Sequence, residues 1–164
     1  MKIIGIDPGY DRLGIAVINA TSRGKEILLF STCIQTSSKD TIYKRFEIIG
    51  KKLSDIIDEY KPDIMAIETL FISKNQKTAM RVSEARGIII YEGLKHGLDI
   101  REYGPMEIKM AITSDGKSDK ERIIKMIPLL IQMPKRDKND VALLDDEYDA
   151  IAVSLTCSAM LKNG

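Results

Sequence analysis

Short apolar runs in the first part of the chain predict three strands. They cover Lys2–Asp7, Leu13–Asn19 and Glu26–Gln35, and turn-forming residues separate them. Because the connections are short, we expect an antiparallel three-stranded meander. Two further runs, Asp63–Glu68 and Leu98–Tyr103, predict strands that alternate with helices.

A different pattern begins at Thr41, where apolar residues recur three or four positions apart and predict helices. The first helix should end before Pro62, because proline interrupts helical hydrogen bonding. The other helices are expected at Asn75–Lys95, Pro105–Ile112, Ser118–Ile131 and Asp145–Leu161. Pro128 should end or kink the helix at Ser118–Ile131.

The order of these elements predicts one α/β domain over residues 1–164, with a five-stranded mixed sheet flanked by helices. A right-handed crossover leads from the meander to the fourth strand, so the first and fourth strands should lie side by side. Asp7 and Glu68, each the last residue of its strand, would then emerge at the same edge of the sheet.

Composition narrows the classes of protein to consider. The chain is 44% hydrophobic, which is enough to bury a core, and no apolar run approaches the length of a membrane span. Two cysteines and one histidine argue against a disulfide scaffold and a zinc site. The acid at position 7 interrupts any signal-peptide pattern. We therefore expect a cytoplasmic protein with no membrane association.

Charge is unevenly distributed along the chain, although the net charge is only +1. Residues 71–138 carry fourteen basic and nine acidic side chains, whereas residues 139–164 carry one basic and five acidic ones. A basic middle beside an acidic group fits a protein that attracts phosphates and concentrates cations. Ordinary variation over a globular surface explains the same distribution, so charge alone does not decide.

Four acids form the candidate chemical site. Asp146 and Asp149 lie three residues apart and share one face of the last predicted helix, which could aim them at Asp7 and Glu68. Four carboxylates in one place repel each other and call for a counter-charge, and oxygen ligands favour Mg²⁺. Two such ions could clamp the reacting oxygens of a phosphodiester. Individually, Asp7 could simply form a turn, and acids near Asp146 could simply favour a helix N-terminus.

Several motifs resemble the RuvC family of Holliday-junction resolvases. They are Ile-Gly-Ile-Asp-Pro-Gly at 4–9, Ala-Ile-Glu at 66–68 followed by Phe71 and Lys74-Asn75, Ala-Arg-Gly at 85–87, and Asp146-x-x-Asp149-Ala150 leading into an apolar helix. The similarity covers nearly the whole chain, in order and with similar spacing. It weakens over 113–138.

The resemblance implies an RNase H-like fold, a homodimer, and four catalytic and metal-binding carboxylates, which match Asp7, Glu68, Asp146 and Asp149 in this chain. It also implies two Mg²⁺ ions per active site, with Mn²⁺ as a substitute. The implied activity is paired cutting of four-way junction DNA, in recombination and repair, leaving 5′-phosphate and 3′-hydroxyl ends. Branch-migration helicase proteins of the host are implied partners.

The resemblance further assigns four residues to DNA binding. Phe71 would engage bases near the junction, and Lys74 belongs to the polar stretch that follows it. Lys109 and Lys120 would lie near the scissile DNA. The alternatives for these residues are a core phenylalanine and solvated helix surface.

Three other functional classes remain to be weighed. A related nuclease could act on other branched DNA or on RNA–DNA hybrids. An actin-like ATPase or sugar kinase also places acids after strands, but 164 residues are too few for two lobes and a Gly-rich phosphate loop is missing. A catalytically silent DNA-binding module is disfavoured by the four acids.

Overall fold

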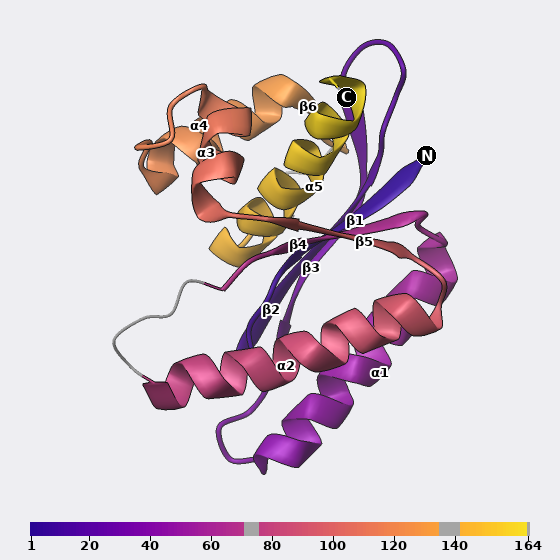
Figure 1. Ribbon diagram of the computed structural model, residues 1–164, viewed down its shortest axis with the longest axis vertical. Coiled ribbons are helices and arrows are strands. Elements are labelled where there is room, and N and C mark those ends of the chain that lie inside the picture. Colours follow the sequence, from indigo (N-terminus) through magenta and orange to yellow (C-terminus); the bar gives the residue numbers. More distant parts are fainter. Residues whose placement is uncertain (71–75, 135–141, 164) are drawn as a thin grey trace.

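The centre of the molecule is a six-stranded mixed sheet, seen in a computed structural model that describes residues 1–70, 76–134 and 142–163 (Figure 1). The strand order is β5-β4-β1-β2-β3-β6. β1 and β2 are antiparallel, as are β2 and β3, so the predicted meander is confirmed. The strands are β1 (Lys2–Asp7), β2 (Arg12–Asn19), β3 (Glu26–Gln35), β4 (Ile64–Glu68), β5 (Asp99–Tyr103) and β6 (Ile131–Gln132).

Five helices cover the two faces of the sheet in the described part of the chain (Figure 1). One face packs against α1 and α2, and the other against α3, α4 and α5. The alternation along β1 follows from strand geometry: Ile3 belongs to the core under α5, and Ile4 belongs to the core under α1. The helices are α1 (Ile42–Tyr60), α2 (Gln76–Lys95), α3 (Pro105–Thr113), α4 (Lys120–Leu130) and α5 (Asp145–Asn163).

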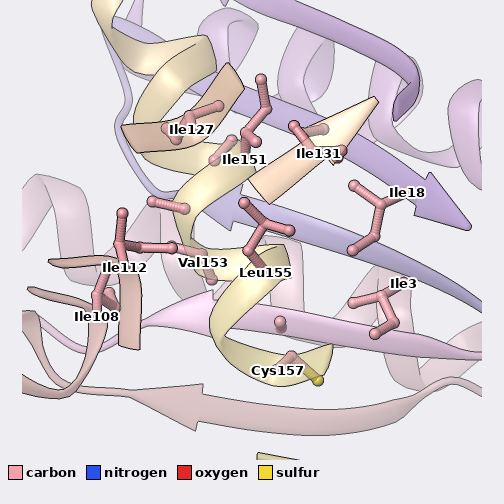
Figure 2. Close-up of a cluster of buried hydrophobic side chains, with 14 of the residues drawn as sticks. Ile3, Ile18, Ile108, Ile112, Ile127, Ile131, Ile151, Val153, Leu155 and Cys157 are labelled. Carbon is pink, nitrogen blue, oxygen red and sulfur yellow. The ribbon is translucent and has the colours of Figure 1, made fainter. Parts of the chain in front are cut away.

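The expectation of five strands is corrected to six by the short strand β6. Its two residues pair in parallel with the start of β3, as Glu26 with Ile131 and Ile27 with Gln132. The sequence predicted a helix through Ile131, but α4 ends at Leu130, shortly after Pro128. Proline lacks the N–H that would continue the helical ladder, and the freed chain reaches the open edge of β3. Ile131 is buried there in the α5-side core (Figure 2).

The helix α5 lies directly on β1 and β2 because both strands carry a glycine beneath it. A Cβ atom at Gly5 would stand 2.2 Å from the carbonyl oxygen of Ala150, and one at Gly14 would stand 2.0 Å from that of Asp146. Both distances are too short for any side chain, so these positions permit the close approach. Further along α5, Ile151, Val153 and other residues fill the core shown in Figure 2.

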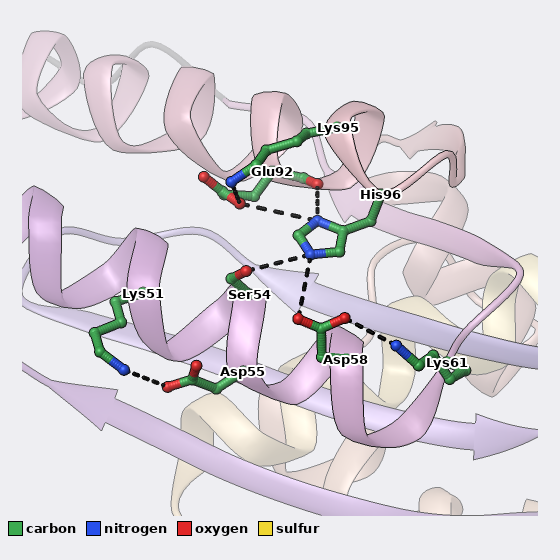
Figure 3. Close-up of polar contacts among 8 residues, drawn as sticks. All are labelled: Lys51, Ser54, Asp55, Asp58, Lys61, Glu92, Lys95 and His96. Atoms are coloured by element: carbon green, nitrogen blue, oxygen red, sulfur yellow. Dashed lines mark hydrogen bonds and ion pairs between the residues drawn. The ribbon is translucent and has the colours of Figure 1, made fainter.

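A polar network joins α1 to α2 on the other side of the molecule (Figure 3). His96 Nδ1 lies 2.7 Å from the Glu92 carbonyl oxygen, and Nε2 lies 3.2 Å from Ser54 Oγ and 3.7 Å from Asp58 Oδ2. The histidine therefore closes the C-terminal end of α2 and ties it to α1. His96 is the one histidine in the sequence, so the candidate site contains none.

Candidate active site

The ends of β1 and β4 bring the first two predicted acids together. The strands are parallel neighbours, and Ile6 pairs with Ile67, so Asp7 and Glu68 follow paired residues at one edge of the sheet. Asp7 ends β1 because the turn-forming pair Pro8-Gly9 follows it, and Glu68 is the last residue of β4. Both side chains are half-buried. This is the carboxyl edge of the parallel strands, where ligand sites form in α/β sheets.

The first turns of α5 supply the other two acids. Asp146 and Asp149 face the sheet edge because the backbone of Asp146 rests on Gly14. Asp146 is 18% exposed and Asp149 is 29% exposed. Asp7, Glu68, Asp146 and Asp149 thus form one group, called the acidic cluster below.

The pKa values of the cluster show that its members share one electrostatic environment. Burial raises the pKa of Asp7 to about 7, and the charges of Asp149, Glu68 and Asp146 add to that increase. Burial and the charge of Asp149 also raise the pKa of Glu68. Repulsion among carboxylates makes the cluster a place where a cation is strongly favoured.

Two basic side chains already contact the acids of α5. Lys120 Nζ lies 2.8 Å from Asp149 Oδ2 and 3.4 Å from Asp145 Oδ2. Burial raises the pKa of Asp149, and the contact with Lys120 offsets only part of that increase. Arg12, the first residue of β2, donates hydrogen bonds to Asp146. Burial acts to raise the pKa of Asp146, but the hydrogen bonds and charge of Arg12, a backbone hydrogen bond and Cys33 together outweigh it, so the net pKa is lowered.

A cleft beside the acidic cluster collects the predicted basic residues. It has a volume of about 210 Å³, and Glu68, Asp149, Lys109 and Lys120 are among the residues that line it. Lys109 comes from α3 and Lys120 from the start of α4, so both helices face the acids across this space. The structure therefore brings Asp7, Glu68, Asp146, Asp149, Lys109 and Lys120 together. Phe71 and Lys74 lie outside the described residues.

The donor set fits a hard divalent cation, although the acids are not arranged around one. Carboxylate oxygens are the ligands that Mg²⁺ prefers, and the charges of Asp149, Glu68 and Asp146 add to burial in raising the pKa of Asp7. Over residues 1–70, 76–134 and 142–163, no three Asp, Glu, His or Cys side chains are grouped to hold an ion. Arg12 and Lys120 explain this, because they bind Asp146 and Asp149 instead.

Sequence reasoning missed Arg12. Its partner Asp146 is 134 residues away in the chain, and an arginine at the start of a strand carries no local signal of such a contact. Gly14 was the one available signal, because a glycine inside an apolar strand often marks the close approach of another backbone.

A mixed sheet with acids at the ends of β1 and β4, and a further pair in the first turns of α5, has the architecture of the RNase H-like nucleases. A family model described as "Crossover junction endodeoxyribonuclease RuvC" matches residues 3–157. A protein of that description from Thermosipho melanesiensis is 40% identical over 155 residues, covering 94% of each chain. The chain belongs to the RuvC family of endonucleases, which are metal-dependent.

Solved structures of the family superpose on the whole chain. Thermus thermophilus RuvC matches with a TM-score of 0.88 and 25% identity, over 100% of this chain and 97% of that one. The same protein in complex with a Holliday junction substrate matches with a TM-score of 0.87 and 24% identity, over 100% and 97% of the two chains. The predicted RNase H-like fold and the predicted family are both confirmed.

No helix among the described residues is long and apolar enough to cross a membrane.

Proposed function

We propose that this chain cuts four-way DNA junctions by Mg²⁺-dependent hydrolysis of two phosphodiesters, leaving 5′-phosphate and 3′-hydroxyl ends. The observation that carries the proposal is the convergence of four carboxylates at one sheet edge, where burial and then the charges of the other three acids raise the pKa of Asp7 to about 7. Family membership supplies the substrate class, because relatives are named crossover junction endodeoxyribonucleases. Residues 1–164 would act as one nuclease domain in recombination and repair, in the cytoplasm.

The acidic cluster would hold the metal. Asp7, Glu68, Asp146 and Asp149 offer oxygen ligands for two Mg²⁺ ions, for which Mn²⁺ can substitute. When bound, such a pair stabilises the attacking and leaving oxygens of an in-line displacement at phosphorus. The acids themselves repel phosphates, so their contribution to holding the substrate is small compared with that of the neighbouring lysines.

The basic side chains of the cleft would bind the scissile strand. Lys109 and Lys120 face the acids across the cleft, at a position where they can hold phosphate oxygens and offset the charge that develops on them. Phe71 and Lys74 follow Glu68 closely in the chain, and we assign them to contacts with unstacked bases and phosphates near the branch. Shape and phosphate placement would then select the junction.

A homodimer would supply the two symmetric cuts, because a two-fold axis relates two active sites to two equivalent strands. The outer face of α2 supports this assembly. Met80, Tyr91 and Leu94 are exposed there by 66%, 62% and 59%. With Gly87 they follow a heptad spacing on the face opposite the buried Ala85 and Ile89.

Branch-migration helicase proteins of the host are further proposed partners. They would act on the same junction DNA before it is cut.

A cleavage assay separates this function from its alternative. Labelled four-way junction, linear duplex and RNA–DNA hybrid are incubated with the protein, with Mg²⁺ and with EDTA. Paired cuts in the junction alone, and only with Mg²⁺, support the proposal. Preferred cutting of the hybrid or of other branched DNA supports a related RNase H-like nuclease instead. Binding without cutting under all conditions would leave only the silent DNA-binding module.

A further inference from the structure

Arg12, the first residue of β2, forms an ion pair with Asp146 of the acidic cluster. Its Nε donates a 2.9 Å hydrogen bond to Asp146 Oδ2, and Nη2 donates to the same oxygen. The arginine side chain is 46% exposed, whereas the aspartate is 18% exposed. The contact therefore lies at the rim of the cluster, with the carboxylate on the inside and the guanidinium reaching it from the solvent side.

The pair differs from the contact that Lys120 makes across the site. Lys120 has a second acid, Asp145, at 3.4 Å, so it keeps a partner if it leaves Asp149. Within the described ranges, Asp146 is the one carboxylate that forms an ion pair with Arg12. Loss of Asp146 would leave the guanidinium without an acid to bind.

A divalent ion and Arg12 would compete for the carboxylate of Asp146. Its Oδ2 already accepts two N–H groups from Arg12, whose charge offsets the negative charge that would attract a cation. An ion with two charges also interacts with Asp7, Glu68 and Asp149, which the guanidinium does not contact. The ion should therefore displace Arg12 when it binds.

The displaced guanidinium would face a shallow opening at the rim of the acidic cluster. Arg12 and Lys120 line this opening of about 390 Å³ together with Leu143, Leu144, Asp145 and Asp146. A guanidinium at this place can bind a phosphate with two parallel hydrogen bonds.

We propose that Arg12 is a counter-ion latch, which holds Asp146 before metal binds and is then released to bind a phosphate of the DNA. The first half concerns metal binding alone. The second half rests on the proposed function, since it requires a DNA substrate.

The first test measures metal affinity without DNA. Calorimetric titration of Mn²⁺ into the Arg12→Gln variant should show binding about 3- to 5-fold tighter than in the wild type, as expected for loss of a competing, partly exposed ion pair. Arg23→Gln makes the same change of charge in the exposed turn between β2 and β3, and should leave the affinity unchanged. The Mn²⁺ affinity of Arg12→Lys should be closer to that of the wild type than the affinity of Arg12→Gln is. Unchanged or weaker binding in Arg12→Gln, with an unaltered melting temperature, would overturn the latch.

The second test measures the salt dependence of junction binding, with Ca²⁺ and with EDTA. Arg12→Gln should lower the log–log slope by about 0.9, the value for one phosphate, with Ca²⁺ only. An equal loss in EDTA would overturn the release step, because Arg12 would then contact DNA whether or not metal is bound. Failure of both proteins to bind junctions would refute the proposed substrate and leave the metal result standing.

Discussion

Asp7 shows how much a single carboxyl group depends on its neighbours. Burial raises its pKa from 3.8 to about 7, and the charges of Asp149, Glu68 and Asp146 contribute to that increase. In the folded chain Asp7 therefore keeps a proton that the unfolded chain has already lost between about pH 4 and pH 7. Stability must fall as pH rises through this window, since the folded state binds more protons than the unfolded state.

The Asp7→Asn variant should remove this pH dependence. Without divalent metal, the melting temperature of the wild type should fall between pH 5 and pH 8 by several degrees more than that of Asp7→Asn. A loss of 1 kcal/mol lowers the melting temperature by about 2–4 °C for a chain of this size. Mg²⁺ at pH 8 should restore the melting temperature of the wild type and have little effect on that of Asp7→Asn. Differential scanning fluorimetry with EDTA and with Mg²⁺ measures both effects. Identical pH profiles for the two proteins would show that Asp7 is not the group responsible.

Substitution of the four acids should also affect cleavage much more than junction binding. Asp7→Asn, Glu68→Gln, Asp146→Asn and Asp149→Asn should each slow junction cleavage by about 10²–10³-fold or more, while the dissociation constant for the junction stays within a few-fold. The reason is that, in the proposed function, these groups would hold metal and not phosphate.

Asp145→Asn is the matched control for this series. Asp145 occupies the same turn of α5 and contacts Lys120, but its side chain is 68% exposed and lies outside the acidic cluster. The Asp145→Asn variant should cut junctions at a rate within a few-fold of the wild-type rate in single-turnover assays. Near-normal cleavage by two or more of the four cluster variants would contradict a shared metal site.

Among the elements, α5 determines whether the site exists, because it carries two of the four acids onto a sheet that carries the other two. Gly14→Ala should push the helix away, since its Cβ would stand 2.0 Å from the backbone oxygen of Asp146. We expect a loss of about 1–3 kcal/mol in the free energy of unfolding and a larger loss of cleavage than of junction binding.

Gly50→Ala is the control for this substitution. Gly50 is buried in α1, and a Cβ there would make a contact of 3.4 Å with Ile88. Because alanine favours the helix, the variant should be as stable as wild type or more so by up to about 1 kcal/mol. Urea unfolding and single-turnover cleavage compare the two variants. If Gly14→Ala cuts as well as Gly50→Ala, the close approach of α5 is not required.

The elements could be predicted from sequence where the pattern was long enough to show a period. The three strands of the meander appear as apolar runs, α1 has a clear helical repeat, and β4 ends in an acid as expected. Residues 150–158 of α5 are buried on all sides, so this helix shows as apolar content and not as a one-sided repeat. The strand β6 could not be predicted, because two residues have no period and their pairing depends on where β3 begins in space. Four acids of the site could be placed from strand ends and helix spacing, whereas Arg12 required knowledge of how α5 lies on β2.

At the scale of the whole molecule, the exposed apolar face of α2 predicts self-association. Wild type should sediment at about twice 18.4 kDa, and the double variant Met80→Glu with Leu94→Glu should sediment as a monomer. Charges buried without partners in a helix seam oppose dimerisation. The monomer should release nicked junctions before the second cut, because a single site must rebind to cut the opposite strand.

Leu129→Glu provides the comparison for the dimer. Leu129 is 61% exposed on α4, on the other side of the sheet, so its charge should leave the dimer intact. Analytical ultracentrifugation with and without junction DNA measures the oligomeric state of the wild type and of both variants. A wild type that remains a monomer in both conditions would rule out the dimer.

The position of α5 at the end of the fold sets the order in which activity can arise during synthesis. A growing chain that has completed β4 carries Asp7 and Glu68 but has neither Asp146 nor Asp149. At about 5–20 residues per second, the ribosome needs roughly 4–16 s to travel from Glu68 to Asp149. A nascent chain therefore lacks half of the acidic cluster until α5 has been made and has settled onto Gly5 and Gly14. By the proposed mechanism, an unfinished copy could not cut DNA.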